Sequence, residues 1–164
     1  MQEALRQSEF SDLINQYKGI ISKICRVYAD NPEDFHDYFQ EAALQLWRSL
    51  ASFRGDAAIS TWIYRVTLNV CLLQNRRKKK HNQIIFTDQL PHGWYEEPGN
   101  AREEMLQQLY GAIRKLKKAD RALIFLYLED KSYQEISDIM GISVTNVGVK
   151  INRIKHRIKE LLNG

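Results

Sequence analysis

The chain has 164 residues, of which 44% are hydrophobic and 27% are charged, with a formal net charge of +4. This composition excludes bulk disorder and is typical of one folded domain or of two small ones. Cys25 and Cys71 are the only cysteines, and no segment reaches the ~20 apolar residues of a membrane span. A disulfide framework and a transmembrane helix are therefore excluded, and a reducing, cytoplasmic location is expected.

Two segments concentrate the positive charge. Residues 57–80 contain six Lys and Arg and no acid, and residues 143–159 contain five together with one His, again with no acid. A single basic segment is usually a solvated helix face. Two of them, each on a patterned helix, favour two contacts with a polyanion.

Helical periodicity covers nearly every long segment and no segment alternates like a strand, so the predicted fold class is all-α. The first helix is predicted over residues 11–28. The second begins at Pro32, where Asn31 is an N-cap candidate and two acids follow, and it extends to about residue 53. The third is predicted from about residue 59 to residue 80.

The second helix has two distinct faces. An apolar stripe is expected to point inward, and it consists of Phe35, Phe39, Ala42, Leu46, Leu50 and Phe53. The other face, called the Trp47 face here, combines acidic, amide and large apolar side chains: Asp37, Gln40, Glu41, Leu44 and Trp47. A tryptophan in such a setting is typical of a protein-docking surface. The pattern equally allows Trp47 to pack against the first helix.

The third helix carries apolar residues at spacings of four, three, four and three: Ile59, Ile63, Val66, Val70 and Leu73. Thr61, Arg65 and Asn75 project elsewhere, and Trp62 lies near the border. An aromatic ring close to such polar groups, after a loop that contains glycine, suits a nucleic-acid surface that stacks or pockets a base. The cluster at residues 76–80 is typical of phosphate contact without base reading.

Periodicity disappears between residues 81 and 100, which include Pro91, Pro98 and two glycines. This segment is interpreted as a linker, although Trp94 and Tyr95 within it argue against a free tether. Helical patterns resume over residues 101–118 and 119–129. The chain is thus predicted to consist of two helical modules, residues 1–80 and 101–164, joined by the linker at 81–100.

The C-terminal module ends in two helices joined by a tight turn. Ser132 and Glu135 form the S-x-x-E capping box, Gly141 is a candidate left-handed turn residue, and Ser143 can cap the last helix. The buried stripe of that helix is predicted to be Val147, Ile151, Ile154, Ile158 and Leu161. The opposite side, called the recognition face here, consists of Thr145, Val149, Asn152, His156 and Lys159.

Asn146, Gly148 and Arg153 flank the recognition face. An exposed Val149 among polar residues is natural for a helix in the major groove, where a methyl group contacts thymine and Asn or Arg bonds to base edges. Gly148 would allow close approach. The pattern favours a DNA-binding helix-turn-helix over the alternative, a plain helical hairpin within a bundle.

Taken together, these motifs make the chain resemble a bacterial RNA polymerase sigma factor of the extracytoplasmic-function type, within the sigma-70 family. The resemblance spans about residues 10–162 and rests on three segments in order: DYFQEAALQLWRSLASF, FRGDAAISTWIYRVTLNVCLLQNRRKKK and LIFLYLEDKSYQEISDIMGISVTNVGVKINRIKHRIKEL. It implies a sigma region 2 helical bundle followed by a helix-turn-helix sigma region 4.

The resemblance also implies a role for each matching residue. Docking on the β′ clamp helices of core polymerase falls to the Trp47 face, which decides the open question about Trp47. Contact with the −10 element falls to Arg54, Gly55, Asp56, Thr61, Trp62, Arg65, Asn69, Arg76, Arg77, Lys78 and Lys79. Reading of the −35 element falls to Ser143, Thr145, Asn146, Gly148, Val149, Lys150, Asn152, Arg153 and His156.

Further expectations concern partners. The resemblance implies binding to the β flap of polymerase, a linker that threads toward the RNA exit path, and a chain that is monomeric when free. It also allows an anti-sigma partner, which is membrane-bound in many relatives. The family often has Lys where this chain has Gly148 and Arg where it has Lys150, so the −35 sequence stays open.

No catalytic constellation is present in the sequence. Phosphate-binding glycine loops and the H-E-x-x-H metal motif are absent from the sequence. The four histidines have no metal-ligand spacing, so neither an enzyme nor a cofactor is expected. Two other functions compete with a sigma factor. A stand-alone helix-turn-helix regulator would usually need a dimer surface, and a sigma-mimic interaction protein would not need two basic helices.

Overall fold

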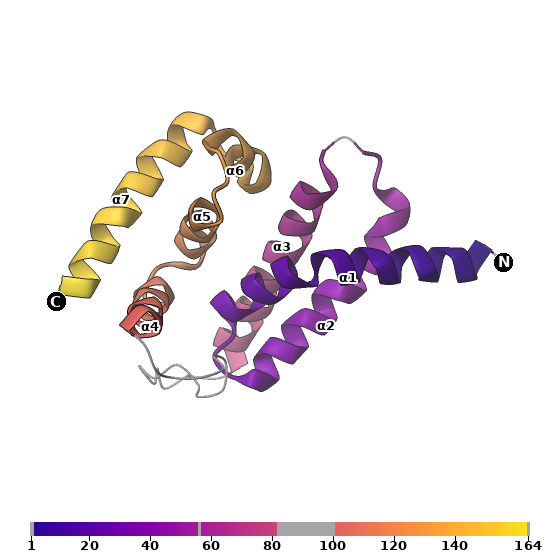
Figure 1. Cartoon of the computed structure of the whole chain (residues 1–164), viewed down its shortest axis with the longest axis horizontal. Coiled ribbons are helices and arrows are strands. Elements are labelled where there is room, and N and C mark those ends of the chain that lie inside the picture. Colours follow the sequence, from indigo (N-terminus) through magenta and orange to yellow (C-terminus); the bar gives the residue numbers. More distant parts are fainter. Residues whose placement is uncertain (1, 56, 82–100, 164) are drawn as a thin grey trace.

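The computed structural model describes residues 2–55, 57–81 and 101–163, with residues 75–81 described by their backbone alone. Within these ranges the chain is helical and has no strand, which confirms the all-α prediction (Figure 1). The helices are α1 (Gln2–Tyr28), α2 (Pro32–Ser49), α3 (Ile59–His81), α4 (Ala101–Arg114), α5 (Lys118–Leu128), α6 (Tyr133–Met140) and α7 (Val144–Asn163), with a short 3₁₀ helix at Leu50–Ser52 after α2.

Helix α1 begins earlier than its apolar pattern predicts. The prediction of a start at Ser11 is wrong, because the helix extends back to Gln2. The added turns carry Arg6, whose guanidinium lies over the Trp47 ring, and they lead into Phe10, which contacts the same ring edge-on. Packing against Trp47 therefore holds a segment that lacks the periodic apolar stripe of the rest of α1.

Helix α2 starts as its sequence predicts. The Asn31 side chain accepts a hydrogen bond from the Asp34 backbone N–H at 2.8 Å, and Pro32 occupies the first turn. The helical structure ends close to the predicted limit of about residue 53: the α-helix stops at Ser49, a 3₁₀ helix continues to Ser52, and the chain becomes extended at Phe53. This change of direction leads the chain into α3.

Helix α3 buries Ile63 and Val70 of its predicted stripe, but its buried arc also extends well beyond that stripe. Its most buried residues include Tyr64, Thr67, Leu68 and Cys71, whereas Leu73 of the predicted stripe is 51% exposed. The buried arc is rotated by roughly a quarter turn from that stripe, at 100° per residue. The reason is that α3 lies between α1 and α2 on one side and α6 on another (Figure 1).

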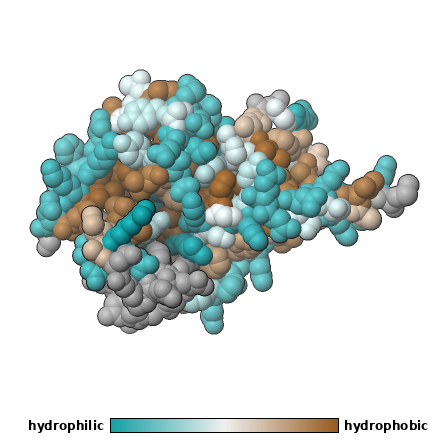
Figure 2. All heavy atoms as spheres, viewed as in Figure 1, coloured by the Kyte–Doolittle hydropathy of each residue, from teal (hydrophilic) through white to brown (hydrophobic). Residues whose placement is uncertain are grey.

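The C-terminal helices follow their sequence signals closely. The complete capping box forms at Ser132 and Glu135, Gly141 has a left-handed φ of 71°, and the Asn146 N–H donates to Ser143 Oγ at 3.1 Å. The helix predicted over residues 101–118 ends earlier, at Arg114. Hydrophobic residues gather on the side of α7 that faces α4 and α5, while hydrophilic residues cover its outer edge (Figure 2).

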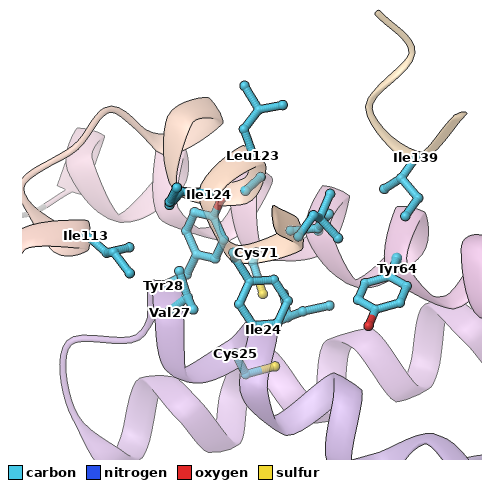
Figure 3. Packing of buried hydrophobic residues seen from close by; sticks show 14 of the residues in the cluster. Ile24, Cys25, Val27, Tyr28, Tyr64, Cys71, Ile113, Leu123, Ile124 and Ile139 are labelled. Atoms are coloured by element: carbon cyan, nitrogen blue, oxygen red, sulfur yellow. The ribbon is translucent and has the colours of Figure 1, made fainter. Parts of the chain in front are cut away.

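One hydrophobic core runs through both groups of helices. The C-terminal end of α1 contacts α4 and α5, and α3 contacts α6. Figure 3 shows Val27 and Tyr28 of α1 lying beside Ile113 and Ile124, which come from α4 and α5. The two groups of helices, α1–α3 and α4–α7, are therefore packed directly on one another. The predicted linker, with Trp94 and Tyr95, lies outside the described residues.

Candidate nucleic-acid and protein interfaces

The Trp47 face lies along the outside of α2. Asp37 and Gln40 are exposed, Leu44 is 39% exposed, and Glu41 and Trp47 are half-buried. The face thus offers a carboxylate and an amide to solvent beside apolar surface. This is the mixture found at the centre and rim of protein interfaces.

Trp47 itself has partners within the chain. Its ring lies 5.1 Å from the Phe10 ring in an edge-on arrangement, and the Arg6 guanidinium lies 4.7 Å from its centre. The alternative in which Trp47 packs against the first helix is therefore part of the structure. Trp47 as a whole is half-buried, and docking of a partner on this face stays a prediction.

The loop between α2 and α3 presents a second predicted surface. Arg54 and Gly55 are exposed, and Gly55 has a φ of 78°, a conformation that favours glycine. Beyond the loop, the Trp62 ring lies 4.9 Å from the Phe53 ring, which fixes its position beside the half-buried Thr61. Asp56 lies outside the described residues.

Arg65 and Asn69 are exposed on α3, next to each other on one side of the helix. Arg65 has a contact that the sequence did not predict: its Nε donates to the Asp138 carbonyl of α6 at 2.9 Å, and its Nη2 donates to the same oxygen. No sequence signal identifies this pairing, because the two residues are far apart in the chain. The backbone of Arg76, Arg77, Lys78 and Lys79 continues α3.

The recognition face of α7 is exposed as predicted. Thr145, Asn152, His156 and Lys159 are exposed, and Val149 has 57% of its surface accessible. Behind this face the helix buries four residues of its predicted stripe, Val147, Ile151, Ile154 and Ile158. Ser143, Asn146 and Arg153 are also exposed, whereas Lys150 is half-buried.

Gly148 has a neighbour within the helix-turn-helix. A Cβ atom added there would lie 3.4 Å from Cε2 of the Tyr133 ring, which belongs to α6. The small residue thus accommodates a tyrosine that packs across the two helices. Close approach to DNA, the role predicted for Gly148, remains a prediction beside this observed one.

Electrostatic effects in the helix-turn-helix stabilise its geometry. The Ser132 backbone N–H donates to Glu135 Oε1, and this hydrogen bond lowers the pKa of the Glu135 carboxyl. The Lys155 ammonium lies 4.2 Å from the centre of the Tyr127 ring, and its contact with that tyrosine raises its pKa. Lys155 is thereby directed to α5, away from the recognition face.

The described ranges hold no group of three His, Cys, Asp or Glu side chains that could bind a metal ion. None of the helices in those ranges combines the length and the apolar character that crossing a membrane requires. The residues predicted to function lie on three surfaces: the Trp47 face, the start of α3 and the recognition face.

Comparison with protein families gives two matches. The model described as Sigma-70 region 2 matches residues 13–81, and the model described as Sigma-70, region 4 matches residues 106–158. The first match covers most of α1 and all of α2 and α3, and the second match includes the helix-turn-helix.

Individual proteins match over nearly the whole chain. The ECF RNA polymerase sigma-E factor of Escherichia coli K12 is 30% identical over 164 aligned residues, with 93% of this chain and 85% of the relative covered. The ECF RNA polymerase sigma factor SigM of Mycobacterium tuberculosis is 27% identical, with 93% and 76% covered.

Two solved structures share the fold. The sigma factor RpoE of Bartonella quintana, solved with the anti-sigma factor NepR, has a TM-score of 0.75 at 17% identity and covers 94% of this chain and 97% of its own. CnrH, solved with the cytosolic domain of CnrY, has a TM-score of 0.70 at 20% identity and covers 96% and 89%.

Proposed function

This chain belongs to the sigma-70 family, as a sigma factor of the extracytoplasmic-function type, and from that premise we propose how its residues divide the work. As a promoter-specificity factor it binds core RNA polymerase, recognises promoter DNA and helps to open the duplex. It is not an enzyme, because the polymerase carries out the chemistry. The observation that carries this conclusion is the presence of both family regions, in order, in a chain that aligns with known sigma factors over nearly its full length.

The Trp47 face is proposed as the surface that docks on the β′ clamp helices of polymerase. Support comes from the exposed Asp37 and Gln40 and from the partly exposed Leu44 on one side of α2. The packing of Arg6 and Phe10 against Trp47 holds that side chain in one position before a partner arrives. A pre-positioned aromatic ring loses less conformational entropy on binding than a mobile one does.

The loop after α2 and the start of α3 are proposed to contact the −10 element. Arg54 and Gly55 are exposed in the loop before α3. Trp62 packs against Phe53 and provides a ring on which an unpaired base can stack. Arg65 and Asn69 extend this surface along α3. The basic cluster at the end of α3 would hold backbone phosphate.

The recognition face of α7 is proposed to read the −35 element in the major groove. A helix-turn-helix places the N-terminal part of its second helix against base edges. Here that part carries Thr145, Asn146 and the exposed Val149, which suit hydrogen bonds to bases and a contact with a thymine methyl group. Arg153 and His156 lie further along α7 and are proposed to contact the groove or its phosphates.

The overall organisation follows from these assignments. We propose a region 2 module at residues 1–80, a linker at 81–100 that threads through the polymerase, and a region 4 module at 101–164 that also contacts the β flap. The cytoplasm is the proposed location. We propose an anti-sigma factor as a further partner, since both structural relatives were solved with a second protein, one of them named as an anti-sigma factor.

Run-off transcription with purified core polymerase and a library of promoters tests this function. Addition of the protein should create start sites that core polymerase alone does not use. The Asp37→Ala/Gln40→Ala variant should lose polymerase binding while its binding to DNA persists. Intact binding to DNA without any new start site would instead identify a stand-alone DNA-binding regulator.

A further inference from the structure

The first turns of α1 lie outside the region 2 match, which begins at residue 13, and they project past the other helices (Figure 1). Among residues 2–10 only two side chains are partly buried, those of Arg6 and Phe10. Leu5 is 61% exposed, so these turns are not held to the molecule by an apolar stripe. Arg6 and Phe10 therefore connect this segment to the rest of the fold.

Both residues contact the same side chain, Trp47 of α2. Because Arg6 and Phe10 are four positions apart, they lie one above the other on one side of α1. The Arg6 guanidinium lies over the indole, 4.7 Å from the ring centre, and the Phe10 ring meets the indole edge-on, with 5.1 Å between the centroids. A short stretch of α1 thus contacts the indole of Trp47 from two directions.

The orientation of this indole matters for any partner that binds the Trp47 face. A tryptophan turns about two side-chain bonds, and the outer bond has only broad preferences. On α2 the ring lies on the same side as Gln40 and Leu44, which are exposed. Affinity falls with the fraction of molecules whose ring is in the orientation that binds. Contacts that hold the ring beforehand therefore raise the affinity without touching the partner.

The contact of Arg6 with Trp47 is suited to this task, because tryptophan offers the best ring for a cation and a planar guanidinium stacks on it. We propose that the N-terminal turns of α1 belong to the polymerase-docking site, and that Arg6 is a positioning residue that holds Trp47 in its docking orientation. The inference rests on the proposed docking at the Trp47 face. It adds to that face a segment that the family match leaves out.

Binding of the full chain to purified core polymerase, measured by competition with a labelled wild-type chain, tests the role of Arg6. Arg6→Gln should weaken binding by roughly two- to tenfold, the effect of one more side chain that has to be ordered on binding. Arg6→Lys should recover most of this loss, because its ammonium can also lie over the ring.

The same pair of helices offers a matched control. The Arg26 guanidinium of α1 lies 5.8 Å from the centre of the Phe35 ring of α2, and Phe35 is not part of the Trp47 face. Arg26→Gln removes the same charge and the same kind of contact, and it should leave polymerase binding unchanged. A loss in Arg6→Gln alone therefore cannot come from the lower net charge of the chain.

A double-mutant cycle separates positioning from direct contact. Trp47→Leu should weaken polymerase binding by itself, and Arg6→Gln added to Trp47→Leu should cause no further loss. If the two losses multiply instead, Arg6 contacts polymerase directly and the positioning role is refuted.

Fluorine NMR reports the ring itself. The chain has three tryptophans, so 5-fluorotryptophan gives three resonances, and Trp47→Phe assigns one of them to Trp47. Arg6→Gln should shift or broaden the Trp47 resonance and leave the resonance of Trp62, which lies against Phe53, unchanged. A change in both resonances would show that Arg6 supports the whole fold, and it would refute a specific effect on Trp47.

Two further outcomes would overturn this inference alone. They are wild-type affinity in Arg6→Gln, and an equal loss of affinity in Arg6→Lys and Arg6→Gln. Wild-type affinity in Trp47→Leu would refute the proposed docking face as well. New start sites in run-off transcription by the wild-type chain would leave the sigma function intact in each of these cases.

Discussion

Helices α3 and α7 carry apolar residues at the same spacing of four, three, four and three, yet in α7 the buried face coincides with this stripe and in α3 it coincides only in part. In α7 the first four stripe residues are buried and the opposite face is exposed. In α3 two stripe residues, Ile63 and Val70, are buried. The buried arc also includes Tyr64, Leu68 and Cys71, whereas Leu73 of the stripe is 51% exposed.

The difference comes from where the partners of each helix lie. Helix α7 is at the edge of the molecule, and α4, α5 and α6 all lie on the same side of it (Figure 1). Helix α3 is in the middle, with α1 and α2 on one side and α6 on another. A periodic stripe thus predicts the buried face of a helix packed on one side, and it predicts only part of that face where partners approach from several directions.

The largest effect should come from the buried arc of α3. Leu68→Ala is expected to lower the free energy of unfolding by about 2–5 kcal/mol, because it removes a side chain that is 3% exposed and leaves a cavity. Leu73→Ala is the matched control, and it should change stability by less than about 0.5 kcal/mol. Urea unfolding of the two variants measures both values. An equal loss of stability in the two variants would mean that Leu73 contributes to the core as its sequence pattern predicts.

The next effect concerns DNA binding through α7. Arg153→Ala is expected to weaken binding to the −35 element by about 1–3 kcal/mol if the arginine bonds to a base edge. Stability should stay nearly unchanged, since Arg153 is exposed. Lys155→Ala is the control. This substitution removes the same charge from another side of α7, where the lysine contacts Tyr127.

Fluorescence anisotropy with different promoter duplexes distinguishes the two variants. Arg153→Ala should change the order of preference among sequences, whereas Lys155→Ala should weaken all of them alike or not at all. If Arg153→Ala also weakened every duplex equally, the residue would contact phosphate and carry no sequence information.

The same contrast explains how much of the molecule the sequence could predict. Local signals sufficed for the helix-turn-helix, since Ser132, Glu135, Gly141 and Ser143 act within a few residues of their own position. They could not reveal the contact of Arg65 with the Asp138 carbonyl, which joins residues 73 positions apart and uses a backbone acceptor that every residue has. Trp47 stayed ambiguous for a related reason, because its partners Arg6 and Phe10 lie on another helix.

A smaller effect tests the contact between Gly148 and Tyr133. Alanine is favoured over glycine within a helix by roughly 1 kcal/mol, and the added Cβ would meet the movable Tyr133 ring at an ordinary 3.4 Å. Gly148→Ala should therefore leave stability unchanged or raise it by up to about 1 kcal/mol, as thermal unfolding would show. Loss of DNA binding in a stable Gly148→Ala variant would support the predicted close approach to the groove. Unchanged binding would leave the packing of Tyr133 as the reason for the glycine.

The smallest effect is the pH dependence of the capping box, a local signal that sequence alone identified. The pKa of Glu135 is lowered in the folded chain from its ordinary value of 4.5, first by the hydrogen bond from the Ser132 backbone N–H and further by the Ser132 side chain and Lys131. A carboxyl whose pKa is lower in the folded state stabilises that state above its unfolded pKa, and this contribution is lost as the pH falls through the folded value. Stability should therefore decline as the pH drops below about 4.5, and the decline should be shallower in Glu135→Gln, whose amide keeps the capping hydrogen bond but does not titrate. Unfolding curves at several pH values compare the two slopes, and parallel slopes would mean that the exposed carboxylate stabilises the helix start no more than the amide does.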